Sequence, residues 1–285
     1  AASCLSARGL ASAAPALTPT RRGARARRAL DTTTRAKAVA EPPASEVRSS
    51  DITMWEGTKR LQTQTTELGP DTTCIRSLDW DRDRFDIEFG LEKGTTYNSY
   101  VIKGSEKTAL VDASHEKFKQ LYIDTLAGVV DLKDIDYIVC SHTEPDHSGL
   151  IGPILDLAPN ATVVGSKVCL KFLEDLVQKP FAQRVVKGGD VIDLGGGHAL
   201  KFIMAPNLHW PDTMFSFDPA SKLMYTCDAF GSHLCSEDVF DTSLETVLPH
   251  YRFYYECLMK PNARSVLTAL RKCASEEADF VGICN

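Results

Sequence analysis

Short apolar runs separated by turn residues fill the chain between residues 73 and 112. The runs are rich in β-branched and aromatic residues, a pattern that predicts short strands. They lie at 73–76, 86–89, 97–102 and 108–112. Residues 49–76 are otherwise polar and weakly periodic, so we expect ordered structure to begin only near residue 73.

The spacing of apolar residues changes after residue 115. Phe118, Leu121, Tyr122 and Leu126 recur at intervals of one to four residues, which predicts an amphipathic helix over 116–130. The pattern further predicts strands at 136–140 and 161–165 and helices at 150–157 and 168–177.

Strand patterns return from residue 185, and the chain ends mainly in helices. Strands are predicted at 185–186, 191–192, 200–203 and 279–284, a hairpin at 214–217 and 222–226, and helices at 251–258 and 263–273. Gly195–Gly197 has no helix after it, so it is interpreted as a turn and not as a phosphate-binding loop. Two blocks of strands with helices between and after them predict two packed sheets flanked by helices, not one doubly wound sheet.

The charge of the chain is unevenly distributed. Residues 1–48 hold nine Lys or Arg against three acids, whereas the rest holds 23 basic and 35 acidic residues. An acid-poor leader rich in Arg and Ser is typical of organelle transit peptides. We predict such a leader over 1–48, with a disordered basic tail as the alternative. No run of 18 apolar residues predicts a membrane span, and we expect no nucleic-acid partner.

Nine cysteines are scattered through the chain without a C-x-x-C pair. This spacing predicts neither a disulfide framework nor a zinc framework, and it favours reduced thiols. Most are expected to be small buried side chains. Whether one of them acts as a redox switch stays open.

Four residues with metal-binding side chains lie within six positions, directly after the predicted strand 136–140. They are His142, Glu144, Asp146 and His147. Alternate residues of an extended chain project to one side, so we expect His142, Glu144 and Asp146 to converge and His147 to reach a second metal. Functional side chains gather in loops at strand ends. The loop is therefore predicted to bind metal.

Two further candidate ligands also follow strand-like runs. They are His209 and Asp228, and the two carboxylate oxygens of Asp228 can serve two metals. Asp112 ends another predicted strand and is expected to orient the ligand loop without binding metal itself. The other histidines are interpreted as surface or hydrogen-bonded side chains: His115, His198, His233 and His250.

The balance of ligand types indicates which metal is bound. A loop dominated by neutral imidazoles would suit zinc and hydrolysis. Glu144 at its second position adds an anionic oxygen, so three carboxylates stand beside three histidines. Such a set favours iron or manganese ions that cycle between +2 and +3. We predict a non-haem di-iron redox site.

The His-x-Glu-x-Asp-His loop resembles that of flavodiiron proteins, a redox branch of the metallo-β-lactamase fold. The runs 94–100, 209–212 and 228–231 also resemble theirs, so the resemblance covers about residues 50–285. It implies an α/β fold, an αββα sandwich of two packed sheets flanked by helices, with a di-iron domain over 49–285. The basic leader suggests plastid-targeted members in the chloroplast stroma, with the mitochondrial matrix as the alternative.

The resemblance also implies a ligand assignment. The first iron takes His142, Glu144 and His209, the second takes Asp146 and His147, and Asp228 bridges the two. The family supplies a further histidine and a flavodoxin-like FMN domain beyond the position of Asn285, so we expect the chain to be incomplete at its C-terminus. Phe89-Gly90 departs from the His-Gly of many relatives, which puts a proton donor there in doubt.

The implied activity is reduction of dioxygen to water, or of nitric oxide to nitrous oxide, with electrons from reduced flavin. In a plastid the protein would act as an electron sink for photosynthesis. Ferredoxin or NAD(P)H is the expected donor, and another flavodiiron subunit, identical or not, the expected partner. The chain alone is expected to be inactive. The alternatives are a dizinc hydrolase related to thioesterases and glyoxalases, and a non-catalytic subunit of a hetero-oligomer.

Overall fold

Strand pairing in this protein begins at residue 48. The structure, a computed structural model, describes residues 45–85, 89–241 and 243–283. Contacts divide the chain after Ala38, and all described residues belong to the second unit, Val39–Asn285. The predicted leader therefore lies outside the described residues up to residue 44, and its last residue, Arg48, belongs to the first strand.

A nine-stranded sheet forms the first layer of strands. Its order is β1-β3-β4-β7-β8-β9-β10-β11, with β2 also paired to β3. The strands are β1 (Arg48–Ser49), β2 (Thr53–Trp55), β3 (Lys59–Gly69), β4 (Thr72–Asp79), β7 (Thr95–Lys103), β8 (Thr108–Val111), β9 (Ile135–Val139), β10 (Thr162–Gly165) and β11 (Gln183–Val185). β8, β9, β10 and β11 are parallel to their neighbours in this run. The predicted strands in this region are confirmed.

The expectation that order begins near residue 73 is wrong. β3 is an eleven-residue strand that pairs with β4 along its length, from Leu61 opposite Asp79 to Gly69 opposite Thr72. Five of its eleven residues are Thr or Gln, so the strand shows no alternating apolar pattern. They are buried but hydrogen-bonded, since the Gln64 side-chain oxygen accepts from Arg76 at 2.7 Å. Satisfied polar groups can be buried in a strand at little cost.

The second sheet has five strands in the order β12-β13-β14-β15-β16. They are β12 (Val191–Gly195), β13 (His198–Met204), β14 (Met214–Asp218), β15 (Leu223–Cys227) and β16 (Phe280–Ile283). The pairings are antiparallel except for β15 with β16, which is parallel. The predicted hairpin is confirmed as β14 and β15. A small ribbon joins β5 (Arg84–Phe85) and β6 (Phe89–Gly90), and the predicted strand at 86–89 lies outside the described residues except for Phe89.

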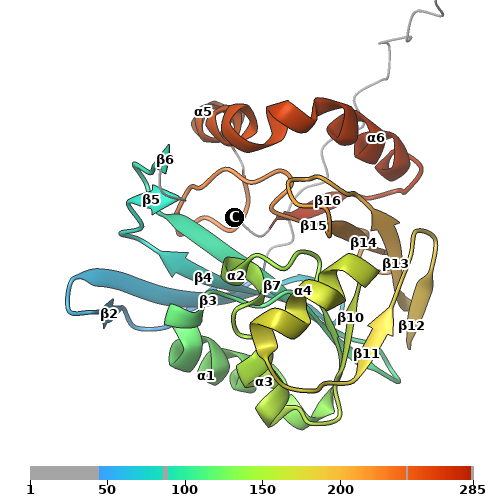
Figure 1. Ribbon diagram of the computed structural model, residues 1–285. Coiled ribbons are helices and arrows are strands. Elements are labelled where there is room, and N and C mark those ends of the chain that lie inside the picture. The colour runs from blue at the N-terminus through green and yellow to red at the C-terminus, as the bar shows by residue number, and fades with distance from the viewer. Residues whose placement is uncertain (1–44, 86–88, 242, 284–285) are drawn as a thin grey trace, which may run out of the picture. The chain divides into compact units, whose positions relative to one another are not determined.

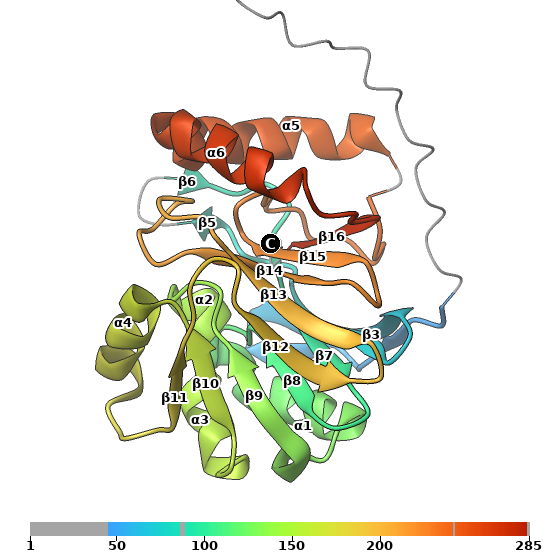
Figure 2. The same cartoon turned by 90° about the vertical axis from the view of Figure 1, so that its right-hand side faces the viewer.

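Helices cover the outer face of each sheet (Figures 1 and 2). The nine-stranded sheet is covered by α1 (Lys119–Val129), α3 (Ile151–Leu157) and α4 (Lys167–Val177), and the other sheet by α5 (Leu244–Tyr254) and α6 (Ala263–Cys273). Shorter turns are η1 (Glu116–Phe118), η2 (Leu132–Asp134), α2 (Pro145–Ser148), the π-helical η3 (Tyr255–Met259) and η4 (Lys260–Asn262). The predicted helix at 251–258 begins seven residues too late, because Pro249 inside α5 hides its first turns.

Three apolar cores hold these four layers together. Tyr122 and Leu173 lie between the nine-stranded sheet and its helices. Phe202 of β13 lies in the core between the two sheets. Its neighbour Ile203 lies with Tyr254 in the core beneath α5 and α6, because successive strand residues face opposite sides. The predicted αββα sandwich of the metallo-β-lactamase type is confirmed.

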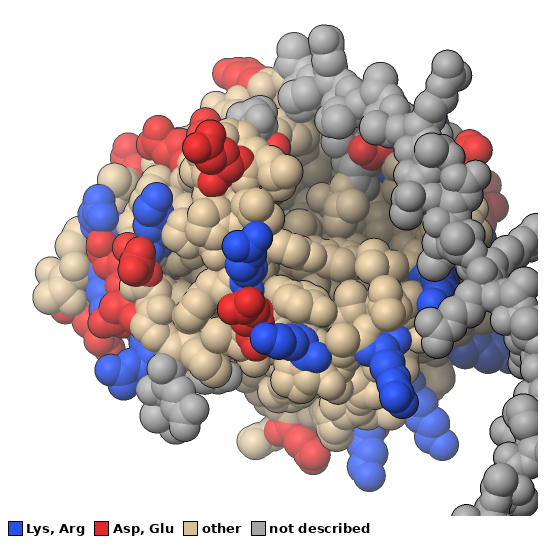
Figure 3. Space-filling view, turned by 90° about the horizontal axis from the view of Figure 1, so that it is seen from above, with Lys and Arg blue, Asp and Glu red and all other residues tan. Residues whose placement is uncertain are grey.

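The outer face of α5 and α6 carries exposed apolar side chains. Seen from above, a broad area of this face shows residues other than Lys, Arg, Asp and Glu (Figure 3). Leu244 is 73% exposed, and Phe253, Leu267 and Leu270 are each more than 40% exposed. Within the described part of the chain, nothing buries these side chains. No helix in that part is long and apolar enough to cross a membrane.

Candidate metal centre

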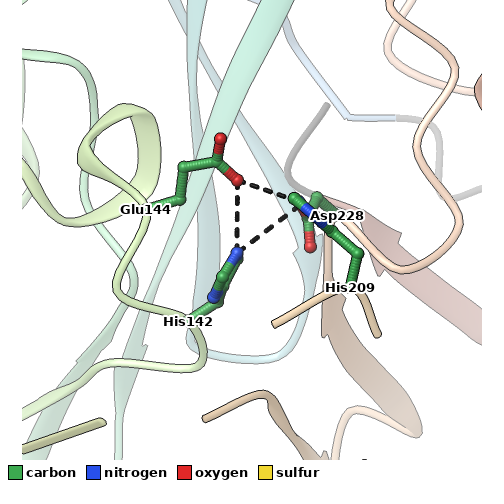
Figure 4. Close-up of side chains that lie close together, drawn as sticks. All are labelled: His142, Glu144, His209 and Asp228. Carbon is green, nitrogen blue, oxygen red and sulfur yellow. Dashed lines mark hydrogen bonds and ion pairs between the residues drawn. The ribbon is translucent and has the colours of Figure 1, made fainter. Parts of the chain in front are cut away.

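The ends of strands from both sheets meet at one buried point. β9 leads into His142 and Glu144, and β15 leads directly into Asp228. His209 enters from the connection between β13 and β14. These four side chains point toward one another (Figure 4). His142 and Asp228 are almost fully buried, whereas Glu144 and His209 are each 12% exposed.

The four side chains enclose a space of ion-binding size. The Glu144 Oε2 atom lies 3.2 Å from His142 Nε2 and 2.9 Å from His209 Nε2. Asp228 Oδ2 lies 3.2 Å from His209 Nε2 and 3.9 Å from His142 Nε2. One ligand atom from each residue lies within 4.8 Å of all the others. Two imidazoles and two carboxylates thus converge on one position.

A second group of ligand atoms adjoins the first. His147 Nε2 lies 3.2 Å from Asp146 Oδ1 and 3.6 Å from Asp228 Oδ2. Glu144, Asp146 and His147 form one close group, and His147 forms another with Cys227 and Asp228. Asp228 therefore belongs both to the group that contains His142 and to a group that contains His147. The structure brings all six predicted side chains together, with Asp228 between two positions.

The expected convergence of His142, Glu144 and Asp146 by strand alternation is wrong. Pro145 begins the short helix α2, and Glu144 is its N-cap residue. Alternation therefore ends at Glu144, and Asp146 lies on a helical turn beside His147. Among the close groups of ligand atoms in the described part of the chain, none contains both His142 and Asp146.

The donor set fits metal ions. Asp228 Oδ2 is close to three histidines, whereas Asp228 Oδ1 is buried and has no hydrogen-bond partner among the described residues. A buried carboxylate oxygen without a partner is costly in a protein interior. A cation beside it would remove that cost, and carboxylates with imidazoles are ligands that iron accepts.

Comparisons with known proteins agree with this geometry. The sequence model described as "ODP family beta lactamase" matches residues 95–278. Diflavin flavoprotein A 1 from Synechocystis is 60% identical over 214 residues, which are 75% of this chain and 37% of that protein. The metal-soaked flavodiiron core of Flv1 from Synechocystis is 35% identical with a TM-score of 0.74, covering 78% of this chain and 56% of that one. The chain belongs to the flavodiiron protein family.

A more distant member of the family has the same fold. The rubredoxin oxygen:oxidoreductase from Desulfovibrio gigas is 27% identical with a TM-score of 0.74, covering 78% of this chain and 56% of that one. The flavodiiron chain described here spans little more than a third of the length of the curated relative it matches.

Asp212 orients one candidate ligand, His142. Its Oδ1 atom lies 3.1 Å from His142 Nδ1, and its Oδ2 atom accepts hydrogen bonds from the backbone and the hydroxyl of Thr143. A carboxylate on the far nitrogen fixes the orientation of a metal-binding imidazole and makes it more basic. Sequence reasoning placed Asp212 only in a motif, although an acid three residues after His209 was a usable signal.

Two further residues hold the site in place. Asp112 Oδ1 accepts a hydrogen bond of 2.8 Å from the backbone of Ser141, next to His142, which confirms its predicted supporting role. The Tyr254 hydroxyl of α5 donates to Asp228 Oδ2 at 3.0 Å. Sequence reasoning missed Tyr254, because nothing in a helix 26 residues away marks it as a neighbour of Asp228.

The remaining histidines differ in their surroundings. His198 lies 2.8 Å from Asp218, and His115 accepts from the backbone of Lys117, as expected of hydrogen-bonded side chains. His233 lines a cavity of about 180 Å³ together with Glu144 and Asp146. Phe89 lies outside this lining and packs edge-on against Phe253. His233 is hydrogen-bonded as expected, through Nδ1 to the Thr95 hydroxyl at 2.9 Å, and it also lies beside the candidate ligands.

The negative charge of the flavodiiron site changes the protonation of its histidines. Burial opposes protonation of His142, but Asp228, Asp212 and Glu144 outweigh it and raise its pKa to about 10. Burial likewise opposes protonation of His209, and Asp228 and Glu144 raise its pKa to about 9. The same contacts lower the pKa of Glu144 to about 2 against the effect of burial. At neutral pH the metal-free site thus holds protons in place of cations.

Metal binding is therefore expected to release about two protons per chain at pH 7, because His142 and His209 must lose theirs to act as ligands. Both pKa values are raised above 7, so metal affinity should increase as the pH rises toward 9 to 10. Calorimetric titration in buffers of different ionisation enthalpy measures the number of protons released on metal binding. Binding without proton release would contradict the assigned protonation.

Proposed function

We propose that this flavodiiron chain belongs to a di-iron oxidoreductase that reduces dioxygen to water, or nitric oxide to nitrous oxide. The observation that carries the proposal is the pair of ligand groups that share Asp228. The name of the Desulfovibrio gigas relative, rubredoxin oxygen:oxidoreductase, supports oxygen as the substrate. Oxygen reduction by a plastid protein would serve as an electron sink for photosynthesis.

The proposed ligand assignment follows the two groups. His142, Glu144 and His209 would hold the first iron, Asp146 and His147 would hold the second, and Asp228, which belongs to both groups, would contribute to each. The iron pair, when bound, supplies the electrons at the point where the substrate reacts. The three carboxylates offset most of the charge of two divalent ions, and Asp212 holds the ring of His142 in one orientation. The cavity beside Glu144 and Asp146 gives a small molecule access to the site.

Electron delivery requires parts outside these residues. We propose that FMN, held by a flavodoxin-like domain or by a partner subunit, passes electrons from ferredoxin or NAD(P)H. The exposed apolar side chains of α5 and α6 support assembly with another flavodiiron subunit, identical or not. Without a flavin partner, residues 49–285 are expected to show negligible steady-state oxygen consumption.

Metal analysis tests the proposed function. The full-length protein produced in iron-replete medium should contain about two irons per chain, because anionic oxygen ligands favour iron over zinc at this site. Elemental analysis measures the iron content, and an oxygen electrode measures the rate of oxygen consumption. Stoichiometric zinc together with thioesterase or glyoxalase activity would show that the hydrolase alternative is correct. Sustained oxygen turnover by residues 49–285 without a flavoprotein would contradict the proposed electron path.

We also propose that the leader directs import into the chloroplast, with cleavage before about residue 50. Its support is compositional, since residues 1–30 contain no acid and are rich in Arg and Ser. A fluorescent protein fused behind residues 1–50 should accumulate in the stroma. A matched fusion with Arg21, Arg22 and Arg25 changed to Glu is the control and should stay outside. Mitochondrial or cytosolic fluorescence from the unaltered leader would contradict the proposal.

A further inference from the structure

His233 is buried at the edge of the proposed di-iron site. It is 4% exposed and lies in the loop that follows Asp228. Its backbone has a φ of 43°, in the left-handed region that residues other than Gly rarely adopt. Strain of this kind persists only where surrounding contacts enforce it, and it is frequent at functional sites.

The ring of His233 is held on three sides. Its Nδ1 atom lies 2.9 Å from the Thr95 hydroxyl of β7. Its ring centre lies 4.3 Å from that of Phe85 and 5.1 Å from that of Tyr254. These contacts fix the plane of the imidazole and leave Nε2 as its available polar atom.

The Nε2 atom has no hydrogen-bond partner among the described residues, although it is buried. His233 lines the cavity of about 180 Å³ whose wall also includes Glu144 and Asp146. A residue that lines a cavity and also carries an unpartnered polar atom is a candidate for binding a molecule that enters that cavity. The cavity is too small for the larger substrates that drug-sized pockets of about 300 Å³ or more accept.

We propose that His233 donates a hydrogen bond from Nε2 to a small diatomic or triatomic ligand in this cavity, and that Thr95 positions it by donating to Nδ1. The inference rests on the proposed function, to whose small substrate it assigns a hydrogen-bond donor. Thr95 acts only through His233 and is a positioning residue.

The electrostatic surroundings support a neutral donor. Burial, which outweighs the opposing charge of Asp228, lowers the pKa of His233 to about 3. A neutral imidazole carries one hydrogen, and its other nitrogen accepts. When the Thr95 hydroxyl donates to Nδ1, the ring hydrogen must be on Nε2.

Azide binding to the iron-loaded 285-residue chain tests whether His233 donates a hydrogen bond to the bound ligand. Azide is a triatomic probe whose charge-transfer absorption reports its affinity for ferric iron. His233→Leu should weaken azide binding about tenfold, the equivalent of about 1.4 kcal/mol, because the hydrogen bond is lost while the apolar contacts to Phe85 and Tyr254 remain. His233→Gln, whose amide can donate from a similar position, should stay within about threefold of the wild type.

Two further variants separate a binding role from a structural one. Thr95→Val keeps the imidazole but removes its fixed orientation, and it should weaken azide about threefold at unchanged iron content. His250→Leu removes a histidine from α5 away from the cavity lining and should leave azide affinity unchanged. Equal azide affinity in the wild type, His233→Leu and Thr95→Val would overturn the inference while leaving the proposed di-iron function intact.

A measurement without metal decides the tautomer. In the metal-free chain labelled with ¹⁵N-histidine, the ring nitrogens of His233 should show hydrogen on Nε2, and their signals should disappear in His233→Gln. Thr95→Val should shift them. Hydrogen on Nδ1 would overturn the inference whatever the iron content. Failure of the wild-type chain to take up iron would instead count against the proposed function, and the ring spectrum would still decide the role of His233.

Discussion

Replacing Asp228 with alanine is expected to lower the affinity of the site for iron by more than a hundredfold. Loss of groups that merely support a ligand costs 10–100-fold, and Asp228 contacts both ligand groups directly. Its Oδ2 atom lies 3.2 Å from His209 Nε2 and 3.6 Å from His147 Nε2. Without it, neither group retains its shared carboxylate, so both ions should be lost on desalting.

The control is Asp175→Ala, which removes an exposed aspartate from α4. It should retain the iron content of the wild type, measured by elemental analysis after gel filtration. Far-ultraviolet circular dichroism establishes that both variants are folded. An Asp228→Ala protein that keeps its full iron content would show that the ligand assignment is wrong.

The second large expected effect is a loss of stability when Gly104, at a contact between the two sheets, is replaced by alanine. Gly104, in the turn between β7 and β8, lies so close to β12 that an added Cβ would overlap the backbone carbonyl of Leu194. That carbonyl also accepts hydrogen bonds of 3.0 Å from the backbones of Glu106 and Lys107. Gly104→Ala must therefore push the sheets apart or break these bonds, and it should lower the free energy of unfolding by about 3 kcal/mol or more.

Gly128→Ala is the matched control for this substitution. Gly128 lies in α1, and an added Cβ there meets nothing within 4 Å. Alanine should raise the free energy of unfolding by about 0.5–1 kcal/mol, because it favours the helix over the unfolded chain. The urea concentrations at the unfolding midpoints of the two variants should thus shift in opposite directions from that of the wild type. Equal midpoints would contradict the close packing of Gly104 against β12.

The layered fold could be predicted because its strands and helices follow strong local patterns. Val-, Ile- and Leu-rich runs such as β9 and β10 are visible in any reading of the sequence, and their two blocks already indicate two sheets. β3 was missed because four of its six buried side chains are Thr or Gln. Their burial depends on partners such as Arg76, which lie on another strand and leave no local signal.

The candidate ligands could be named because four of them lie within six residues. Their arrangement could not be derived from spacing, because the helix that Pro145 begins overrides the alternation of an extended chain. Asp212, Tyr254 and His233 were missed as members of the site for a different reason. Each reaches the ligands through tertiary contacts, and a lone His or Asp in a loop is more often structural.

β16 attaches a long segment of the chain to the edge of its sheet. Among the described strands, β16 pairs with β15 and ends the sheet, so residues 228–283 leave β15 and return to its edge. Release of this segment breaks no ladder among β12, β13, β14 and β15. In hydrogen-exchange terms it forms a candidate unit that opens below the free energy of global unfolding. Such an opening carries Tyr254 and His233 away while His142, His147 and His209 stay on the closed body. Backbone amides around His233 are therefore expected to exchange more readily than those around the three candidate ligand histidines.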